Sequence, residues 1–238
     1  MKTPLVFGKN LRQKPEFTFS LSYGRIISEK VFCCSMNRGA KLSKFEILDR
    51  LVEENKGYLR TSVVLEHDVS KSTLSKYVKA RGLERVAHGI YQAEDAWDDD
   101  YFLLYVRNGR IVFSHESALY LYGFMDREPS ITTVTVPSNY NSTHIREQGV
   151  RVIHIKPKWH QMGIASVKTS IGNEVPVYDR ERTLCDIIRA KKDIEVQTFQ
   201  TAIKEYMNSK GKNLGNLMYY AKTLGIEKDV RIYTEVML

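Results

Sequence analysis

The segment Asp68–Tyr91, DVSKSTLSKYVKARGLERVAHGIY, constrains the fold of this chain more than any other stretch. Its spacing of apolar residues predicts a helix over Lys71–Ala80, preceded by turn and cap residues and ended by Gly82. A His-Gly turn then joins two short strands, Leu83–Ala87 and Ile90–Gln92. The chain must therefore place a capped helix and a hairpin next to each other.

Two further helices are expected before this segment. Leu42–Asn55 carries apolar residues at the three-and-four spacing of one buried face, with Ser43 as a cap and Gly57 as a stop. A shorter helix is expected over Arg60–His67 and should bury Val63, Val64 and Leu65. Three helices followed by a small hairpin is the order of a winged helix-turn-helix, which we assign to residues 36–93.

A polar, acidic stretch, Glu94–Asp100, ends this pattern and marks the expected start of a second domain, residues 94–238. Strands are expected there at Arg110–Phe113, Thr132–Val136, Val150–Ile155, Ala165–Thr169 and Val175–Tyr178. Helices are expected at Tyr101–Val106, His115–Tyr122 and Arg180–Ala190, and a helical C-terminal cap at Glu195–Asn208, Leu214–Leu224 and from Lys228 onward. The second domain is therefore expected to be a mixed-sheet α/β domain, and the whole chain α+β.

Residues 1–35 differ from the rest of the chain, because they show neither helical nor strand periodicity over any useful length. We expect a disordered extension, or a start assigned upstream of the native one, since Met36 stands just before the first well-patterned helix. An ordered N-terminal arm that docks on the body is the alternative.

Positive charge is concentrated rather than spread along the chain. The formal charge is +8, of which residues 1–35 hold +4 and Ser70–Gln92 the other +4, so that the remainder sums to zero. Cations gathered on one helix and its hairpin favour a nucleic-acid partner.

The composition also limits the cellular setting. No apolar run is long enough to span a membrane, and the first residues lack the apolar core of a secretory signal. Three cysteines, two of them adjacent (Cys33 and Cys34), have neither a disulfide framework nor zinc-ligand spacing. A reducing cytoplasm, with no membrane partner, is the simplest expectation.

The helix over Lys71–Ala80 divides into two faces. Leu74, Tyr77 and Val78 are spaced to pack against a core. The other face suits duplex DNA, because ammonium groups pair with phosphates and small hydroxyls reach phosphates or base edges. The candidate DNA-binding residues are Lys71, Ser72, Thr73, Ser75, Lys76, Lys79 and Arg81 on the helix, with Arg85 and His88 on the wing. A lysine-rich helix exposed only to solvent is the alternative.

Arginine is nearly absent from this face, although bidentate readout of guanine favours it. Sequence reading is therefore expected to be modest for each half-site. It would then depend on more than one bound copy or on DNA shape.

The densest group of reactive side chains lies in VPVYDRERTLCDIIRA, Val175–Ala190. Cys185 as a nucleophile would need a histidine base, and the helical spacing makes it a packing residue instead. Asp179 is expected to cap the helix, Arg182 and Asp186 to form an i,i+4 pair, and the group to anchor this helix to the sheet. We interpret the motif as structural: Asp179, Arg180, Glu181, Arg182, Cys185 and Asp186.

No metal or cofactor site is expected from the sequence. His115, His144, His154 and His160 are scattered, without a spacing that places two on one helical face. No glycine-rich phosphate loop follows any expected strand, and Ser166 stands where a metal-dependent nuclease would need an acid. A binding protein without catalytic residues is therefore favoured over an enzyme.

Several stretches together resemble one known family. They are HGIY (His88–Tyr91), FSHESALYLYG (Phe113–Gly123), TVTVP (Thr133–Pro137), VPVYDRERTLCD (Val175–Asp186) and the tail Ala202–Ile226. Over most of Met36–Leu238 the chain is similar to the AbiEi-type antitoxins of bacterial abortive-infection (type IV) toxin–antitoxin systems, and YDRERTLCD is the most specific match.

The resemblance implies a cytoplasmic regulator whose winged helix binds inverted repeats in the promoter of its own operon and represses it. It also implies a C-terminal domain that counteracts a nucleotidyltransferase-like toxin without needing direct contact with it. Two alternatives stay open: a nucleic-acid-processing enzyme of nuclease type targeted by the winged helix, and a winged helix that binds protein.

Overall fold

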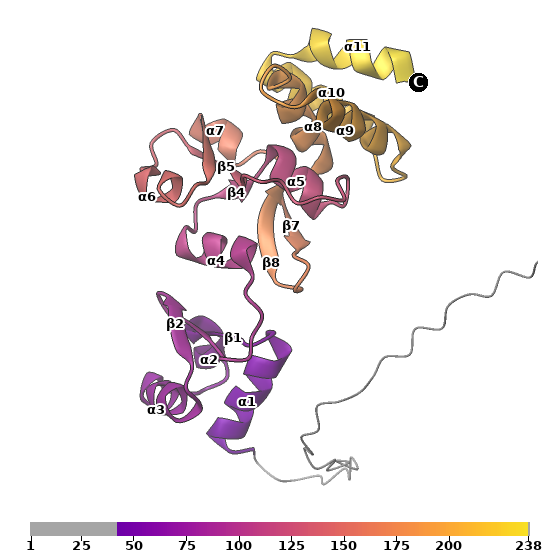
Figure 1. Ribbon diagram of the computed structural model, residues 1–238. Coiled ribbons are helices and arrows are strands. Elements are labelled where there is room, and N and C mark those ends of the chain that lie inside the picture. The colour runs from indigo at the N-terminus through magenta and orange to yellow at the C-terminus, as the bar shows by residue number, and fades with distance from the viewer. Residues whose placement is uncertain (1–41, 238) are drawn as a thin grey trace, which may run out of the picture. The chain divides into compact units, whose positions relative to one another are not determined.

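The structure, a computed structural model, describes residues 42–237 (Figure 1). The expectations for residues 1–35 lie outside the described residues. Residues 42–238 form one compact unit, so the boundary expected at residues 93 and 94 stays a prediction about organisation along the sequence. The α+β class is confirmed.

The first part has the expected order of three helices and a hairpin, with one strand added. Its elements are α1 (Lys44–Glu54), β1 (Tyr58–Arg60), α2 (Thr61–Glu66), α3 (Lys71–Arg81), β2 (Glu84–Ala87) and β3 (Ile90–Gln92). Ser43 caps α1 as expected, because its Oγ accepts a hydrogen bond from Glu46 N at 3.2 Å while Glu46 Oε2 accepts from Ser43 N at 2.7 Å. Leu48, Leu51 and Val64 are buried between these helices.

Two details of this part differ from expectation. Strand β1 pairs antiparallel with β3, so β3 of the hairpin is the middle strand of a three-stranded sheet in the order β1-β3-β2. Leu65 is 44% exposed rather than buried, whereas Val64 is buried and Val63 is half-buried against the same core. The pairing of β1 is non-local, and three residues are too few to show a period in the sequence.

The second part contains a five-stranded mixed sheet, and all five expected strands are confirmed. The strands are β4 (Val112–Phe113), β5 (Thr133–Pro137), β6 (Arg151–Ile155), β7 (Ile164–Lys168) and β8 (Glu174–Tyr178), in the spatial order β6-β5-β4-β8-β7. The pairs β4–β8 and β5–β6 are parallel, and β4–β5 and β7–β8 are antiparallel.

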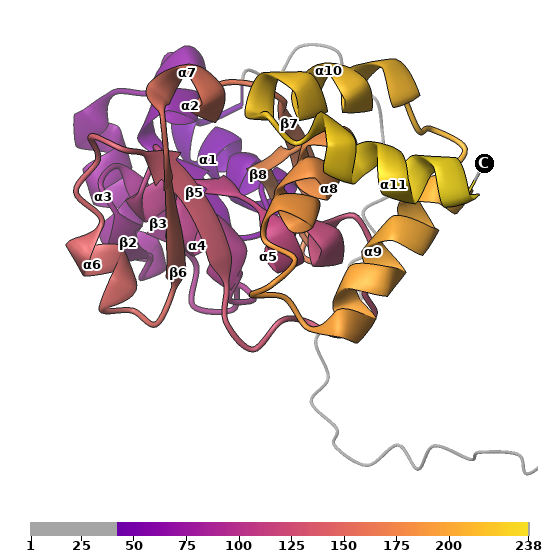
Figure 2. The same cartoon turned by 90° about the horizontal axis from the view of Figure 1, so that it is seen from above.

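Eight helices accompany this sheet in the described residues. They are α4 (Asp100–Arg107), α5 (His115–Leu121), α6 (Thr143–Arg146), α7 (Pro157–His160), α8 (Arg180–Arg189), α9 (Val196–Asn208), α10 (Leu214–Leu224) and α11 (Glu227–Met237). The one-turn helices α6 and α7 are additions to the expected elements, because four residues carry no periodic signal. Figure 2 shows α9, α10 and α11 gathered around α8, which is the helical C-terminal cap.

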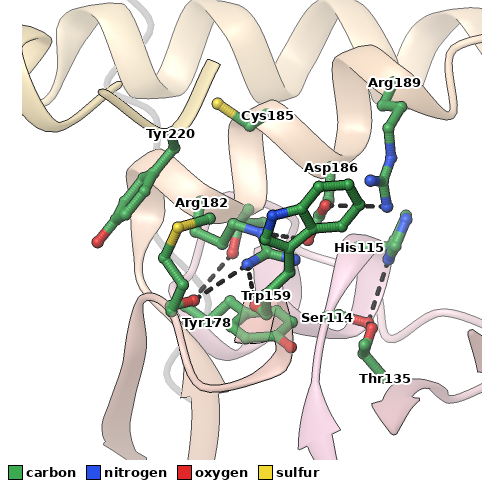
Figure 3. A network of polar contacts seen from close by, with 12 residues as sticks. Ser114, His115, Thr135, Trp159, Tyr178, Arg182, Cys185, Asp186, Arg189 and Tyr220 are labelled. Carbon is green, nitrogen blue, oxygen red and sulfur yellow. Dashed lines mark hydrogen bonds and ion pairs between the residues drawn. The ribbon is translucent and has the colours of Figure 1, made fainter. Parts of the chain in front are cut away.

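Helix α8 is organised by a guanidinium that has no access to solvent. Arg182 is fully buried, and its Nε donates to Asp186 Oδ2 at 3.0 Å (Figure 3). Its Nη1 donates to the backbone oxygens of Trp159 and Met162 at 2.7 and 3.0 Å. Its planar face lies 4.3 Å from the ring centre of Tyr178. One side chain therefore joins α8 to the α7 turn and to β8.

The carboxylates of the same motif reach the C-terminal helices. Asp179 caps α8, with Oδ1 accepting from Arg182 N at 2.7 Å, while its Oδ2 accepts from Tyr220 on α10 at 2.7 Å. Glu181 Oε1 accepts from Tyr206 on α9 at 3.0 Å and from Asn213 N at 2.8 Å. The sequence predicts that the motif anchors α8 to the sheet; Arg182 does contact Tyr178 of β8, and Asp179 and Glu181 additionally tie α8 to neighbouring helices.

The two parts of the described chain share one hydrophobic cluster, since Tyr58 and Ile90 pack with Tyr101 and Phe102. The acidic stretch between the parts starts the next helix, as the sequence predicts, because Asp99 Oδ1 accepts from Phe102 N at 3.0 Å.

The second oxygen of Asp99 holds the hairpin of β7 and β8. Oδ2 accepts from Thr169 Oγ1 at 2.5 Å and from Asn173 Nδ2 at 2.9 Å. On the other side, Tyr58 OH donates to Trp97 O at 3.0 Å and accepts from Asp99 N at 3.2 Å. Asp99 is buried, so the winged helix is fastened to the sheet by satisfied polar contacts.

We predict that Asp186→Asn destabilises the protein by about 3–5 kcal/mol, because it leaves the Arg182 charge buried without its counter-charge. Chemical denaturation measures this change. The matched control is Asp229→Asn, which removes an exposed pair with Lys191 and should cost about 0–1 kcal/mol. Equal losses in the two variants would contradict the central role given to the buried pair.

We also predict that the free energy of unfolding falls as the pH drops from 7 toward about 5. Burial lowers the pKa of both His115 and His160 below the ordinary histidine value. The unfolded chain then binds protons below about pH 6.5 that the folded chain does not, so acid favours unfolding. His160→Asn should flatten the pH dependence, which chemical denaturation at a series of pH values measures.

Candidate nucleic-acid interface

Helix α3 is built from local signals at both of its ends. Ser70 Oγ accepts a hydrogen bond from Thr73 N at 3.3 Å, which starts the helix. Gly82 ends it in the left-handed conformation, with φ of 67°. Leu74 and Tyr77 are buried, as expected, and they fix which face of α3 points outward.

The outward face of α3 carries the expected lysines. Lys71, Lys76 and Lys79 are all exposed, and Ser75 is exposed among them. No acidic residue lies between Lys71 and Arg81, so the face presents unopposed positive charge within the helix itself. An outward row of ammonium groups on a helix is suited to phosphate contacts in a DNA groove.

The hydroxyls at the start of α3 already take part in the cap. Ser70 Oγ lies 2.9 Å from both Ser72 Oγ and Thr73 Oγ1. These three hydroxyls therefore form a small hydrogen-bonded group at the helix end that would meet base edges. Contact with a base would exchange one of these internal bonds for an intermolecular one.

Arg81 lies apart from the other candidates, at the far end of α3. Its Nη2 is 2.7 Å from Asp49 Oδ2 on α1, and Asp49 Oδ1 accepts from Tyr77 OH at 2.8 Å. Burial and this hydrogen bond raise the pKa of Tyr77. Arg81 thus joins α3 to α1, and its role as a DNA contact stays a prediction.

The wing residues come together at the hairpin turn. Arg85 and His88 are exposed, and Arg85 Nη2 lies 3.1 Å from His88 Nδ1. Gly89 has φ of 69°, and a side chain there would press on Thr61 at the start of α2. The two candidate side chains of the wing are therefore exposed together at the hairpin turn.

Arg107 is a residue at this surface that the sequence did not single out. It is exposed at the end of α4, and its Nε donates to Val86 O in β2 at 3.1 Å. In the sequence, the one indication that the Arg107 side chain is exposed is its position at the end of a helix, with no acidic residue close by after Asp100.

The other dense group, the motif on α8, is closed to solvent. Cys185 is fully buried, and burial raises the pKa of its thiol to about 12. His115 is also buried, and in the network of Figure 3 its Nδ1 lies 3.1 Å from Ser114 Oγ. A thiol with this pKa holds its proton at neutral pH, so it lacks the thiolate that nucleophilic attack requires.

Within residues 42–237, no three His, Cys, Asp or Glu side chains come together in a way that could hold a metal ion. His144, His154 and His160 lie in three different environments. In the same part of the chain, no helix has both the length and the apolar character needed to cross a membrane.

Comparison with known proteins does not assign this chain to a family. No protein-family model matches the chain, and no curated protein matches it. Among solved structures, the chain is similar to the crystal structure of RV2827C protein from Mycobacterium tuberculosis, at 13% identity and a TM-score of 0.41 over 81% of each chain. A likeness at this level carries no argument about function.

We predict that Lys76→Ala weakens binding to duplex DNA of any sequence and lowers the slope of log affinity against log salt by about one unit. The reason is the loss of one phosphate contact and its released counterion. Fluorescence anisotropy across a salt series measures both quantities. Lys222→Ala, an exposed lysine on α10, is the matched control. An unchanged salt slope in Lys76→Ala would contradict the placement of α3 in a groove.

Proposed function

We propose that this protein is a DNA-binding antitoxin that represses its own operon and counteracts a nucleotidyltransferase-like toxin. The observation that carries the DNA-binding part is the outward face of α3, where exposed lysines stand beside an exposed wing. The family resemblance of the sequence supplies the antitoxin part, which stays a proposal.

The partner is double-stranded DNA from the promoter of the same operon, read as inverted repeats by more than one copy of the chain. With lysine rather than arginine on α3, one copy gains much of its affinity from phosphates and less from bases. Two copies on one site would restore specificity by adding modest half-site preferences. Neutralising the toxin would not require direct contact with it.

We propose that the protein acts without a catalytic step. Two features of the described residues support this. Cys185 is a buried thiol with a raised pKa. The carboxylates at α8 already accept hydrogen bonds from the side chains of Arg182, Tyr206 and Tyr220. A nuclease would need acids free to hold a metal or to activate water. Cleavage of plasmid DNA or RNA by the pure protein with divalent metal would contradict this proposal.

The experiment that tests the proposed function compares two duplexes of equal length and composition. One comes from directly upstream of the gene, and the other is a scrambled version. We expect fluorescence anisotropy to show upstream binding at least ten times tighter, because a specific reader gains base contacts beyond the shared phosphate contacts. Equal and strongly salt-dependent binding to the two duplexes would contradict the proposal that the upstream DNA is a specific operator. No binding to either duplex would contradict the proposal that DNA is the partner.

A further inference from the structure

The acidic linker Glu94–Asp100 presents a tryptophan to solvent. Its sequence is EDAWDDD, and Trp97 in its middle is 77% exposed. Tryptophan is on average one of the more buried residues of a folded protein, and it is enriched where proteins bind one another. DNA binding by α3 and the wing gives this side chain no role.

The backbone that carries Trp97 is held in place by the end of α1 and by β1 (Figure 1). Trp97 O accepts from Tyr58 OH at 3.0 Å, and Ala93 N donates to Gly57 O at 2.9 Å. The approach is so close that a side chain at Gly57 would collide with Ala96. The indole therefore projects from a fixed backbone, and a partner that binds it does not have to order the linker first.

Trp97 lines one of two adjoining hollows. The first, of about 640 Å³, lies between α1, the linker and Ile171 in the turn that joins β7 and β8. The second, of about 620 Å³, lies between α1, the end of α3 and the linker. Asp49, Val52 and Asp95 line both hollows, so the two form one groove, which we name the linker groove. Each hollow is large enough to take several side chains.

The linker groove combines apolar side chains with an excess of acids. Its apolar lining includes Val52, Leu83, Ala93, Trp97 and Ile171. Its acids are Asp49, Glu53, Glu94 and Asp95, and its cations are Lys56 and Arg81. Because Asp49 is paired with Arg81 at 2.7 Å, the other three acids face a single lysine.

We propose that the linker groove is a docking site for a partner protein, bound through a segment that carries arginine or lysine with apolar residues between them. Charge complementarity selects this occupant, because the acids of the groove attract cations and repel the phosphates of DNA. A guanidinium can stack on the indole of Trp97. Apolar side chains of the segment can cover Val52 and Ile171.

This docking site is distinct from the surface proposed to bind DNA. Of the candidate DNA-binding residues, only Arg81 lines the linker groove, and it is paired with Asp49 there. The exposed lysines of α3 do not line it. The docking site therefore does not depend on the DNA-binding function, and each can be tested without the other.

The test titrates the full chain into a labelled synthetic peptide of about 16 residues, about 24 Å long as a helix. Arginines and leucines are spaced to lie on opposite faces of that helix. A second peptide has glutamate in place of every arginine. Fluorescence anisotropy measures affinity. The chain has two tryptophans, Trp97 and the half-buried Trp159, so tryptophan emission also reports whether the peptide covers Trp97.

We expect the arginine peptide to bind at least ten times more tightly than the glutamate peptide and to shift tryptophan emission to shorter wavelength. Trp97→Ala should weaken binding about ten- to thirtyfold and abolish the shift, since a central tryptophan carries much of the binding energy of such a contact. Trp97→Phe should keep most of the affinity. Asp95→Asn should weaken binding about two- to fivefold and reduce its salt dependence.

Matched controls are Tyr219→Ala on α10, where the side chain is 61% exposed, and Glu235→Gln on α11. Both should bind the peptide as the parent does. Because the substituted side chains are exposed, the free energy of unfolding should stay close to that of the parent, which chemical denaturation checks. The backbone oxygen of Trp97 that Tyr58 uses is retained in every variant.

Three results would overturn the docking site: equal affinity for the two peptides, no binding of either, or equal binding by Trp97→Ala and the parent. Sedimentation of the chain alone tests the other occupant. Self-association that Trp97→Ala abolishes would place a second copy in the linker groove and overturn the choice of a separate basic partner. A chain that stays monomeric and binds the arginine peptide through Trp97 would support it.

Discussion

The fold of the sheet domain depends on one buried charge. Arg182 has no access to solvent, and removing a guanidinium from water is costly unless its donors and its charge are all matched. Asp186, two backbone oxygens and the ring of Tyr178 supply most of that match from three different elements, while Nη2 of Arg182 is buried without a hydrogen-bond partner among the described residues. The contacts form only when α7, α8 and β8 are correctly placed together, so the pair favours a single arrangement of these elements.

A second set of buried polar contacts, around Asp99, connects this domain to the winged helix. Asp99 holds the start of α4 and the β7–β8 hairpin at once, and its backbone N–H donates to Tyr58 OH in β1, so this group of contacts joins the two parts of the described chain.

Local features of the fold were predictable from the sequence, and non-local ones were not. The start of α3 at Ser70 and its end at Gly82 follow from side-chain capping and from the left-handed conformation that glycine tolerates. The i,i+4 pair of Arg182 and Asp186 follows from helical spacing. The partners of Glu181, by contrast, lie on α9 and just before α10, and nothing in the local sequence indicates them. Strand β1 was missed for the same reason. Of the candidate interface, the lysines of α3 could be predicted from amphipathic spacing, whereas Arg107 required knowledge of which strand its helix end meets.

The central claim is that the outward face of α3 and the wing form the DNA-contacting surface. Hydrogen exchange of backbone amides, followed with and without the upstream duplex, tests it most directly because the whole described chain is observed in one experiment. Slower exchange on adding DNA is predicted within Ser70–Gln92, with α9 to α11 unchanged. Unchanged exchange in Ser70–Gln92, or slower exchange confined to the C-terminal helices, would contradict the account.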